Sequence, residues 1–399
     1  MKRVYITTAL TCLVILALLA GYLQVFHPFS ELSGVKVGFI YDNDESTAYT
    51  YNFSLAAEAL QKKYGAGVEF YSRSNVPDDK TEEPLRELAA KGCNVIFLNG
   101  YSEQVISLAE EYPSIQFCQT SYMDMTGVGT PANYHSFKGE AYQGRYVSGI
   151  VAGMKLKEMI DGGLILPGEA VLGFVAAFPS SEVISGYTAF LLGARSVAPQ
   201  ATMRVRYTGT WSSYSREKSA AKALLDEGCL IISQHSDTIG PAVACEEAAG
   251  SREKPVYYVG YNQVMSEVTP TTSLVTTRIN WEPYVLSAVE AVIRQKAIET
   301  VVPGKVHGTD MSAGFDRGWV EMLELNQQLA APGTREAMDS AIEQFRRGNG
   351  GMVFRGDYTG VDPDNPLDTC DLREGYEENA TSSFPTFHYI LKDIIFIDP

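Results

Sequence analysis

The chain has 399 residues, 45% of them hydrophobic, and a formal net charge of −16. This length allows two ordinary domains, and the apolar content is typical of a folded globular protein. The acidic balance argues against a nucleic-acid partner, because phosphate binding needs clustered Lys and Arg, and the only cluster of that kind stands at the extreme N-terminus.

The first segment differs from the rest. Lys2 and Arg3 precede residues 5–26, which carry no charge and are long enough to cross a bilayer as one helix of about 20 residues. A secretory signal has a shorter apolar run, roughly 7–15 residues, and the small-x-small cleavage pattern is poor around Ala20. We therefore expect a bacterial, extracytoplasmic protein with a retained membrane anchor within residues 1–30, a cleaved signal being the alternative.

From residue 35 onward, short apolar strands alternate with helices. Strands that read as nearly continuous apolar runs belong to parallel sheets covered by helices on both faces. In the first half we expect strands at 35–41, 68–74, 94–99 and 115–120, and helices at 50–63, 81–91, 103–111 and 139–159.

The same alternation restarts at residue 169. Expected strands are 169–178, 202–209, 230–234, 256–261 and 273–279, and expected helices are 182–197, 215–227, 240–249 and 282–296. The pattern predicts an α/β protein of two doubly wound parallel-sheet lobes. Lobe 1 covers 35–135, with about 275–300 returning to it, and lobe 2 covers 136–272.

One helix-to-strand turn has a similar sequence pattern in the two lobes. "ELAAKGCNVIFLNG" (87–100) and "KALLDEGCLIISQHS" (222–236) each end a helix with Gly-Cys and then begin a strand. We interpret both as the entrance to the third strand of a lobe. Cys93 and Cys118 are expected as buried free thiols, and the absence of C-x-x-C removes support for a thiolate zinc site.

Residues 301–399 form a looser segment, rich in Gly, Pro and Asp, which we expect to pack on the lobes. It contains an expected helix at 335–347 and expected strands at 351–354 and 387–397. No function is assigned to it from sequence.

Ligands of doubly wound sheets bind outside the carboxyl ends of the strands, so binding residues should follow strands. Aromatic side chains from opposed loops suit a flat heterocycle, and His, Asp and Asn suit its polar edge. The candidate ligand-binding residues are Tyr49, Tyr101, Phe178, Glu182, Trp211, His235, Asp237, Asn262 and Trp281. The alternatives are an exposed loop tyrosine for Tyr49, hinge packing for Trp211 and core packing for Trp281.

Several stretches resemble the BMP family of PnrA-like basic membrane lipoproteins: 140–154, 171–201, 207–237 and 259–270, the last reading "VGYNQVMSEVTP". The resemblance covers about 36–300 and, more faintly, 350–360. It implies a substrate-binding protein of an ABC importer, of the type I periplasmic binding-protein fold, with a three-strand hinge between the lobes. Its partners would be permease and ATPase subunits and a small ligand, mainly purine nucleosides or related compounds.

In this family two aromatic rings sandwich the purine base, and the matching positions here are Tyr49 and Trp211. Relatives often carry Asp where Asn262 stands, to bind ribose hydroxyls, and an acidic residue where Ser213 stands. These two departures favour a free base or an altered ligand over a nucleoside.

Other function classes have weaker support. The motifs of serine hydrolases, zinc peptidases and P-loop proteins are missing, and His235 and Asp237, two apart, should point to opposite sides of an extended loop. Asp42, Asp44 and Glu45 lack the spacing of a calcium loop and are interpreted as a solvated acidic turn. We expect no enzyme, cofactor or metal. A membrane-anchored ligand sensor of the same fold stays open.

Overall fold

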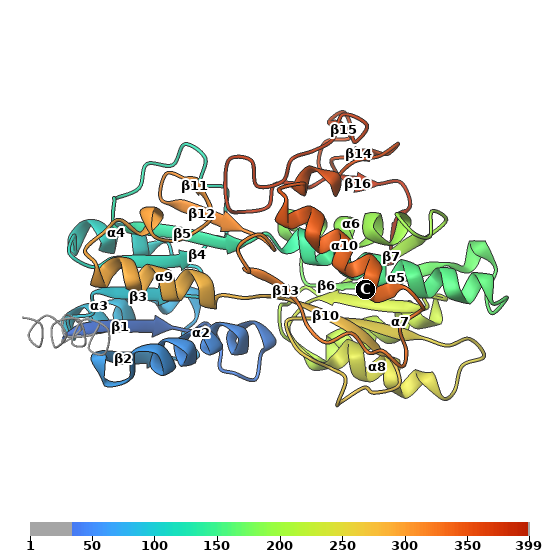
Figure 1. The fold of residues 1–399 in the computed structure, drawn as a ribbon, viewed down its shortest axis with the longest axis horizontal. Helices are drawn as coiled ribbons and strands as arrows, with labels where there is room; N and C mark the ends of the chain where they lie inside the picture. Colours follow the sequence, from blue (N-terminus) through green and yellow to red (C-terminus); the bar gives the residue numbers. More distant parts are fainter. Residues whose placement is uncertain (1–33, 398–399) are drawn as a thin grey trace, which may run out of the picture.

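The computed structural model describes residues 34–397. The predicted anchor, residues 5–26, lies outside the described residues, and so does Cys12. Within 34–397, no helix combines the length and the apolar character that a membrane span needs. Two lobes lie side by side, each built on one seven-stranded sheet (Figure 1).

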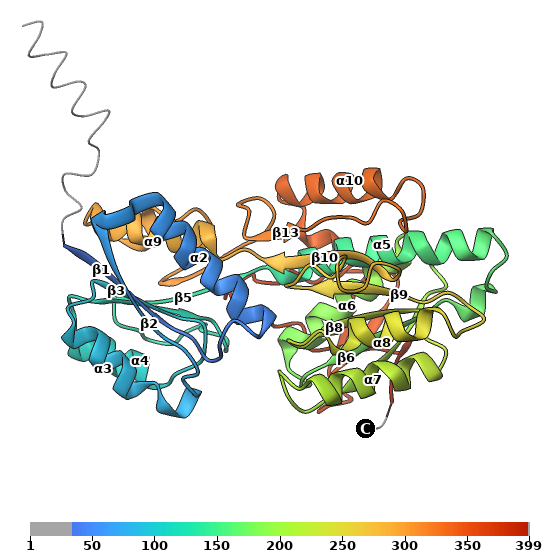
Figure 2. The same ribbon diagram turned by 90° about the horizontal axis from the view of Figure 1, so that it is seen from below.

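The sheet of lobe 1 has the strand order β11-β12-β5-β4-β3-β1-β2, parallel except for β11. Helices α2 and α9 cover one face and α3 and α4 the other (Figure 2). The elements are β1 (Val35–Ile40), α2 (Ala48–Tyr64), β2 (Val68–Arg73), α3 (Glu82–Ala90), β3 (Val95–Leu98), α4 (Gln104–Glu111), β4 (Gln116–Thr120), β5 (Tyr134–Gly139), α9 (Glu282–Ile293), β11 (Lys305–His307) and β12 (Asp310–Ala313).

The sheet of lobe 2 has the order β13-β10-β9-β8-β6-β7-β17, parallel except for β13. Helices α5 and α6 cover one face, α7 and α8 the other, and α10 lies outside α5 (Figure 2). The elements are α5 (Ala141–Asp161), β6 (Val171–Ala176), α6 (Ser181–Arg195), β7 (Thr202–Tyr207), α7 (Tyr214–Asp226), β8 (Ile231–His235), α8 (Gly240–Ala249), β9 (Tyr257–Tyr261), β10 (Ser273–Ile279), β13 (Val320–Met322), α10 (Thr334–Arg346) and β17 (Ile394–Phe396).

The repeated Gly-Cys turn has a structural counterpart in both lobes. Cys93 precedes β3 and Cys229 precedes β8, and each of these strands pairs with the first strand of its lobe, β1 and β6. A Cβ atom on Gly38 of β1 would lie 3.4 Å from the sulfur of Cys93, and one on Gly173 of β6 would lie 3.2 Å from that of Cys229. Each lobe therefore packs a buried thiol against a glycine of its first strand. All five described cysteines are free, as expected for Cys93 and Cys118.

Strand β5 was not expected from the sequence. Its residues, YHSFKG, are half polar, yet all of them are buried, because β5 lies between β4 and β12. Its polar side chains have partners from distant parts of the chain: His135 bonds Gln116 at 2.8 Å, and Ser136 donates to Asp310 at 2.6 Å. A strand stabilised in this way carries no apolar periodicity that would reveal it.

The chain passes between the lobes three times, at 139–141, 279–281 and 313–320. Strand β10 pairs with β9 and β13, so it belongs to lobe 2, and the return to lobe 1 begins near residue 280 instead of 275. The 301–399 segment is shared: β11 and β12 extend the first sheet, and β13 and β17 extend the second.

The C-terminal segment departs from its predicted elements. Residues 350–352 form a short 3-10 turn where a strand was expected. The expected strand at 387–397 is divided into β16 (Ile390–Leu391) and β17. Strand β16 joins β14 (Thr359–Val361) and β15 (Thr369–Asp371) in a small sheet beside α6.

Helix α5 packs most closely on α6. A Cβ atom on Gly149 would lie 2.1 Å from the carbonyl oxygen of Phe190, and one on Gly193 would lie 2.0 Å from that of Tyr146. The two helices therefore touch backbone to backbone, which only glycine allows at these positions.

Candidate functional site

A pocket lies between the lobes, at the carboxyl ends of both sheets. The empty space inside it is about 560 Å³, part of which is open to solvent. Lobe 1 contributes Asp42, Tyr49, Asp78, Tyr122 and Lys138, and lobe 2 contributes Glu182, Trp211, His235, Asp237 and Tyr261.

Two aromatic side chains reach this pocket from opposite lobes. Tyr49 stands in the first turn of α2, where its hydroxyl lies 3.3 Å from the Oγ1 atom of Thr120 and its ring meets Trp281 edge-on. Trp211 follows β7 and remains 37% exposed. Phe178 and His235 lie beside it, with ring centroids 5.6 and 6.0 Å away and interplanar angles of 63° and 61°, so neither ring stacks flat on the indole.

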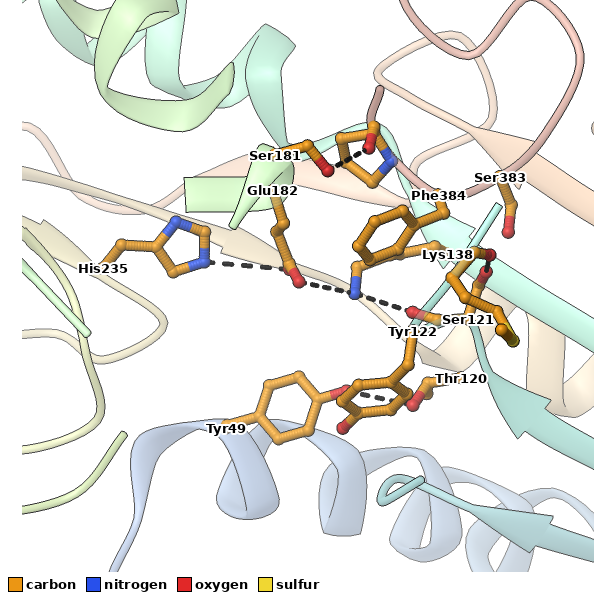
Figure 3. A network of polar contacts seen from close by, with 12 residues as sticks. Tyr49, Thr120, Ser121, Tyr122, Lys138, Ser181, Glu182, His235, Ser383 and Phe384 are labelled. Atoms are coloured by element: carbon orange, nitrogen blue, oxygen red, sulfur yellow. Dashed lines mark hydrogen bonds and ion pairs between the residues drawn. The ribbon is translucent and has the colours of Figure 1, made fainter. Parts of the chain in front are cut away.

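A buried ion pair crosses the pocket between the lobes (Figure 3). The ammonium of Lys138, at the end of β5, lies 2.9 Å from Glu182 and donates to the carbonyl of Ser121 at 2.9 Å. The ring of Tyr122 lies 5.1 Å from the same nitrogen. Both ionic side chains are nearly inaccessible, 3% for Lys138 and 12% for Glu182, so this contact is shielded from solvent screening.

His235 stands at the end of β8, 3.8 Å from the second oxygen of Glu182. Burial lowers its pKa well below the ordinary value, and the nearby cations Arg145 and Lys138 lower it further. The imidazole is therefore neutral at neutral pH, with one nitrogen donating and one accepting. Its Nδ1 atom has no hydrogen-bond partner among the described residues.

Asp237 is half-buried, and no hydrogen bond from a described residue reaches its carboxyl group. Burial raises its pKa well above the ordinary value, and the carboxylates of Glu217, Asp42 and Glu182 add to the shift. Its backbone N–H donates to the carbonyl of Trp211 at 2.9 Å, which ties the two pocket loops together. The carboxyl group is available to a ligand N–H or O–H.

His235 and Asp237 both line the pocket, although their spacing in sequence suggested opposite sides. That prediction assumed an extended loop, whereas the chain bends directly after β8. The acidic turn also differs from its interpretation. Asp44 and Glu45 are exposed, but Asp42 lines the pocket and accepts hydrogen bonds from Thr50 and Asn99, each at 2.9 Å.

Four predicted residues stand outside the pocket lining. Phe178 packs behind Trp211, and Tyr101 lies against Tyr122 at 5.8 Å. Asn262 is buried, and its side-chain oxygen accepts from the backbone of Ile279 at 3.3 Å. Its own carbonyl accepts from Asn52 of α2, so it joins the lobes, while its side-chain nitrogen is buried without a hydrogen-bond partner among the described residues.

Trp281 is the fourth of these residues, and it is 1% exposed. It packs against Phe53 and Phe137 in the core of lobe 1, with ring centroids 5.5 and 5.7 Å away. The alternative of core packing therefore describes its position. It supports Tyr49 from behind, since the two rings meet edge to face.

Five lining residues were missed: Asp42, Asp78, Tyr122, Lys138 and Tyr261. Asp42, Tyr122 and Tyr261 stand at or just after the ends of predicted strands, so the rule used for the other candidates could have found them. Asp78 follows the strand predicted at 68–74 by four residues, just as the candidate Glu182 follows the strand at 169–178, so the same rule applies to it. Lys138 had no such signal, because it lies on the unexpected β5. The described residues include a group close enough to share an ion, Asp362, Asp368 and His388, but it lies in the C-terminal segment and not in the pocket.

A family model described as "ABC transporter substrate-binding protein PnrA-like" matches residues 31–346. The chain belongs to this family. The PnrA-like protein is therefore a substrate-binding component of an ABC transporter, of a family that works outside the cytoplasm, and not an enzyme.

Individual relatives agree with this assignment. A purine-binding protein of Brucella abortus is 29% identical over 283 residues, 70% of this chain and 74% of the relative. A putative ABC transporter glucose-binding protein of Haloferax volcanii is 29% identical over 258 residues, 64% of this chain and 60% of that relative. Among solved structures, an ABC transporter solute-binding protein from Conexibacter woesei shares the fold, with a TM-score of 0.60 at 19% identity, covering 79% of this chain and 97% of that one.

Proposed function

We propose that this PnrA-like protein binds a purine base or a related flat heterocycle between its lobes and delivers it to an ABC permease. The observation that carries the proposal is that Tyr49 and Trp211 reach one pocket from opposite lobes. Aromatic rings on both sides of a planar ligand give a stacking site whose two halves meet only when the lobes are together. The purine-binding relative supports the ligand class.

The polar lining fits the edge of such a ring. Neutral His235 can donate or accept, and the carboxyl group of Asp237 has no hydrogen-bond partner among residues 34–397. The Lys138–Glu182 pair adds a donor and an acceptor at the junction of the lobes. A base edge presents donors and acceptors in fixed order, so this set favours a heterocycle with several ring nitrogens over an apolar ligand.

We infer a free base more than a nucleoside. The position where relatives often hold a ribose-binding Asp is Asn262, and its side chain bonds the backbone of Ile279. Because a bound ligand touches both lobes, it shifts the protein toward the closed state by its higher affinity for that state. The closed form would then meet the permease, while a separate ATPase subunit hydrolyses ATP. Residues 5–26 would hold the protein at the outer face of the membrane.

A sugar is the second candidate, because the glucose-binding relative has the same 29% identity as the purine-binding one, over a smaller share of the chain. Aromatic faces together with Asp42 and Glu182 could also hold sugar hydroxyls.

Isothermal titration with adenine, adenosine and glucose separates these ligands. We expect adenine to bind more tightly than adenosine, and glucose to give no heat at the same concentrations. Binding of glucose alone would replace the proposal with the sugar alternative. Mass spectrometry of the small molecule released from the denatured protein gives an independent identification.

A further inference from the structure

A loop at residues 378–386 lies beyond the part of the chain matched by the family model, and it runs beside the pocket. Figure 3 shows Ser383 and Phe384 next to Lys138, in a segment far from it in sequence. No role was predicted for this loop.

The loop has a built-in shape. The buried carboxylate of Glu378 accepts hydrogen bonds from the backbone N–H groups of Thr386 and Phe387, at 2.5 and 3.2 Å, which closes its base. The side-chain amide of Asn379 donates to the carbonyls of Ser382 and Ser383, at 3.1 and 2.7 Å. These hydrogen bonds make the loop rigid, so its tip and its base move together.

The base of the loop is attached to lobe 2. Ser185 of α6 donates to the carboxylate of Glu378 at 2.7 Å, and Ser181 donates to the carbonyl of Pro385 at 2.8 Å (Figure 3). Phe387 stacks on Phe354 at 4.3 Å, and β17 further along the chain pairs with β7.

The tip of the loop is bonded to lobe 1. One carboxylate oxygen of Asp310, on β12, accepts from the Ser382 hydroxyl at 3.0 Å and from the Ser383 N–H at 2.6 Å. The backbone N–H of Met125 donates to the Ser382 hydroxyl at 3.2 Å. The ring of Phe384 lies 5.3 Å from the ammonium of Lys138, which it covers opposite Tyr122.

We propose that residues 378–386 form a latch that holds the lobes together beside the ligand pocket, and that Phe384 positions Lys138 in the pocket wall. Separation of the lobes breaks the bonds of Ser382 and Ser383 to lobe 1 together with the Lys138–Glu182 pair. The ligand-free protein therefore has a closed population that the latch maintains. Phe384 acts through Lys138 and is a positioning residue.

The test measures how fast Lys138 is acylated by an amine-reactive reagent, with mass spectrometry of its peptide, in ligand-free protein. Lys138 is 3% exposed, so it reacts only when the latch and lobes open. Ser382→Ala removes the hydroxyl that bonds Asp310 and Met125, and Phe384→Ala removes a cation–π contact. Each should raise the Lys138 rate at least about two- to tenfold, the factor for one hydrogen bond or one cation–π contact. Phe384→Tyr keeps the ring and should restore the wild-type rate.

Two controls make the measurement specific. Lys155, 7% exposed on α5 within lobe 2, should react equally in all variants. Ser107→Ala removes a serine hydroxyl whose bond to Gln104 is local, and it should leave Lys138 unchanged. An unchanged Lys138 rate in the Ser382 and Phe384 variants overturns the proposal, and so does an equal rise at Lys138 and Lys155, which would mean general loosening.

The latch proposal rests on the proposed function only in taking this pocket as the ligand site. The acylation test needs no ligand, so its result is independent of the adenine titration. Either proposal can therefore be refuted while the other is supported.

Discussion

Replacing Trp211 by Ala tests whether the pocket holds a flat ring. The side chain makes two edge contacts inside the protein and is 37% exposed, so its removal should change the free energy of unfolding by less than about 1 kcal/mol. The indole should matter to the ligand, because stacking of a base on an aromatic side chain contributes about 1–3 kcal/mol.

This range of about 1–3 kcal/mol corresponds to an expected loss of affinity for adenine of about five- to 150-fold. Isothermal titration measures it, and urea denaturation of the same preparations shows whether the fold is intact. Phe178→Ala is the matched control, since Phe178 contacts Trp211 but stands outside the pocket lining. Its effect should stay below about threefold, roughly 0.6 kcal/mol.

If wild-type protein binds adenine and Trp211→Ala binds it within about threefold of wild type, the stacking assignment is wrong. Equal losses in the Trp211 and Phe178 variants would show that the loop, and not the indole ring, is needed. Either result would leave the family assignment untouched, because that depends on residues 31–346 as a whole.

Three further predictions concern stability, pH and specificity. Asp237→Asn should raise the melting temperature at about pH 7.5 but not at about pH 4. Burial raises the pKa of this carboxyl in the folded state above 3.8, so its ionisation increasingly opposes folding as the pH rises. Calorimetry at both pH values measures the two melting temperatures. The same variant should bind adenine more weakly at neutral pH, as measured by titration. Gly193→Ala should lower the free energy of unfolding by about 1–3 kcal/mol or more in urea denaturation, because its Cβ would lie 2.0 Å from the carbonyl oxygen of Tyr146. Gly168→Ala is the control: a Cβ there would have no atom within 4 Å, so its free energy of unfolding should be unchanged. Asn262→Asp should leave the ratio of adenosine to adenine affinity unchanged, since this side chain bonds the backbone outside the pocket; a clear gain for adenosine in parallel titrations would restore a ribose role for it.

The sequence by itself determined the two-lobe architecture. Most strands of both sheets are apolar enough to be read from composition alone, because a parallel strand covered by helices on both faces must be apolar on both sides. The Gly-Cys repeat identified equivalent helix-to-strand turns in the two lobes, because Cys93 and Cys229 each pack beside a glycine of the first strand of their lobe. The loops after the strands located Tyr49, Trp211 and His235, since carboxyl ends of parallel strands gather at one edge.

Only the tertiary structure decided which side chains share the pocket and which merely support it. Lys138 looks like a solvated charge in the sequence. Its burial depends on Ser121, which follows β4, and on Glu182, which stands on α6 of the other lobe. Trp281 has the sequence character of a binding aromatic, yet α2 and β5 enclose it.

The C-terminal loop shows the same division. Residues 378–386 have no apolar period, because their order comes from the buried carboxylates of Glu378 and Asp310. Polar contacts of this kind depend on the distance and direction between two groups in space, and the neighbouring residues in the sequence determine neither the distance nor the direction. Apolar periodicity, by contrast, is written along the chain, and for that reason the sheets could be predicted and the network between the lobes could not.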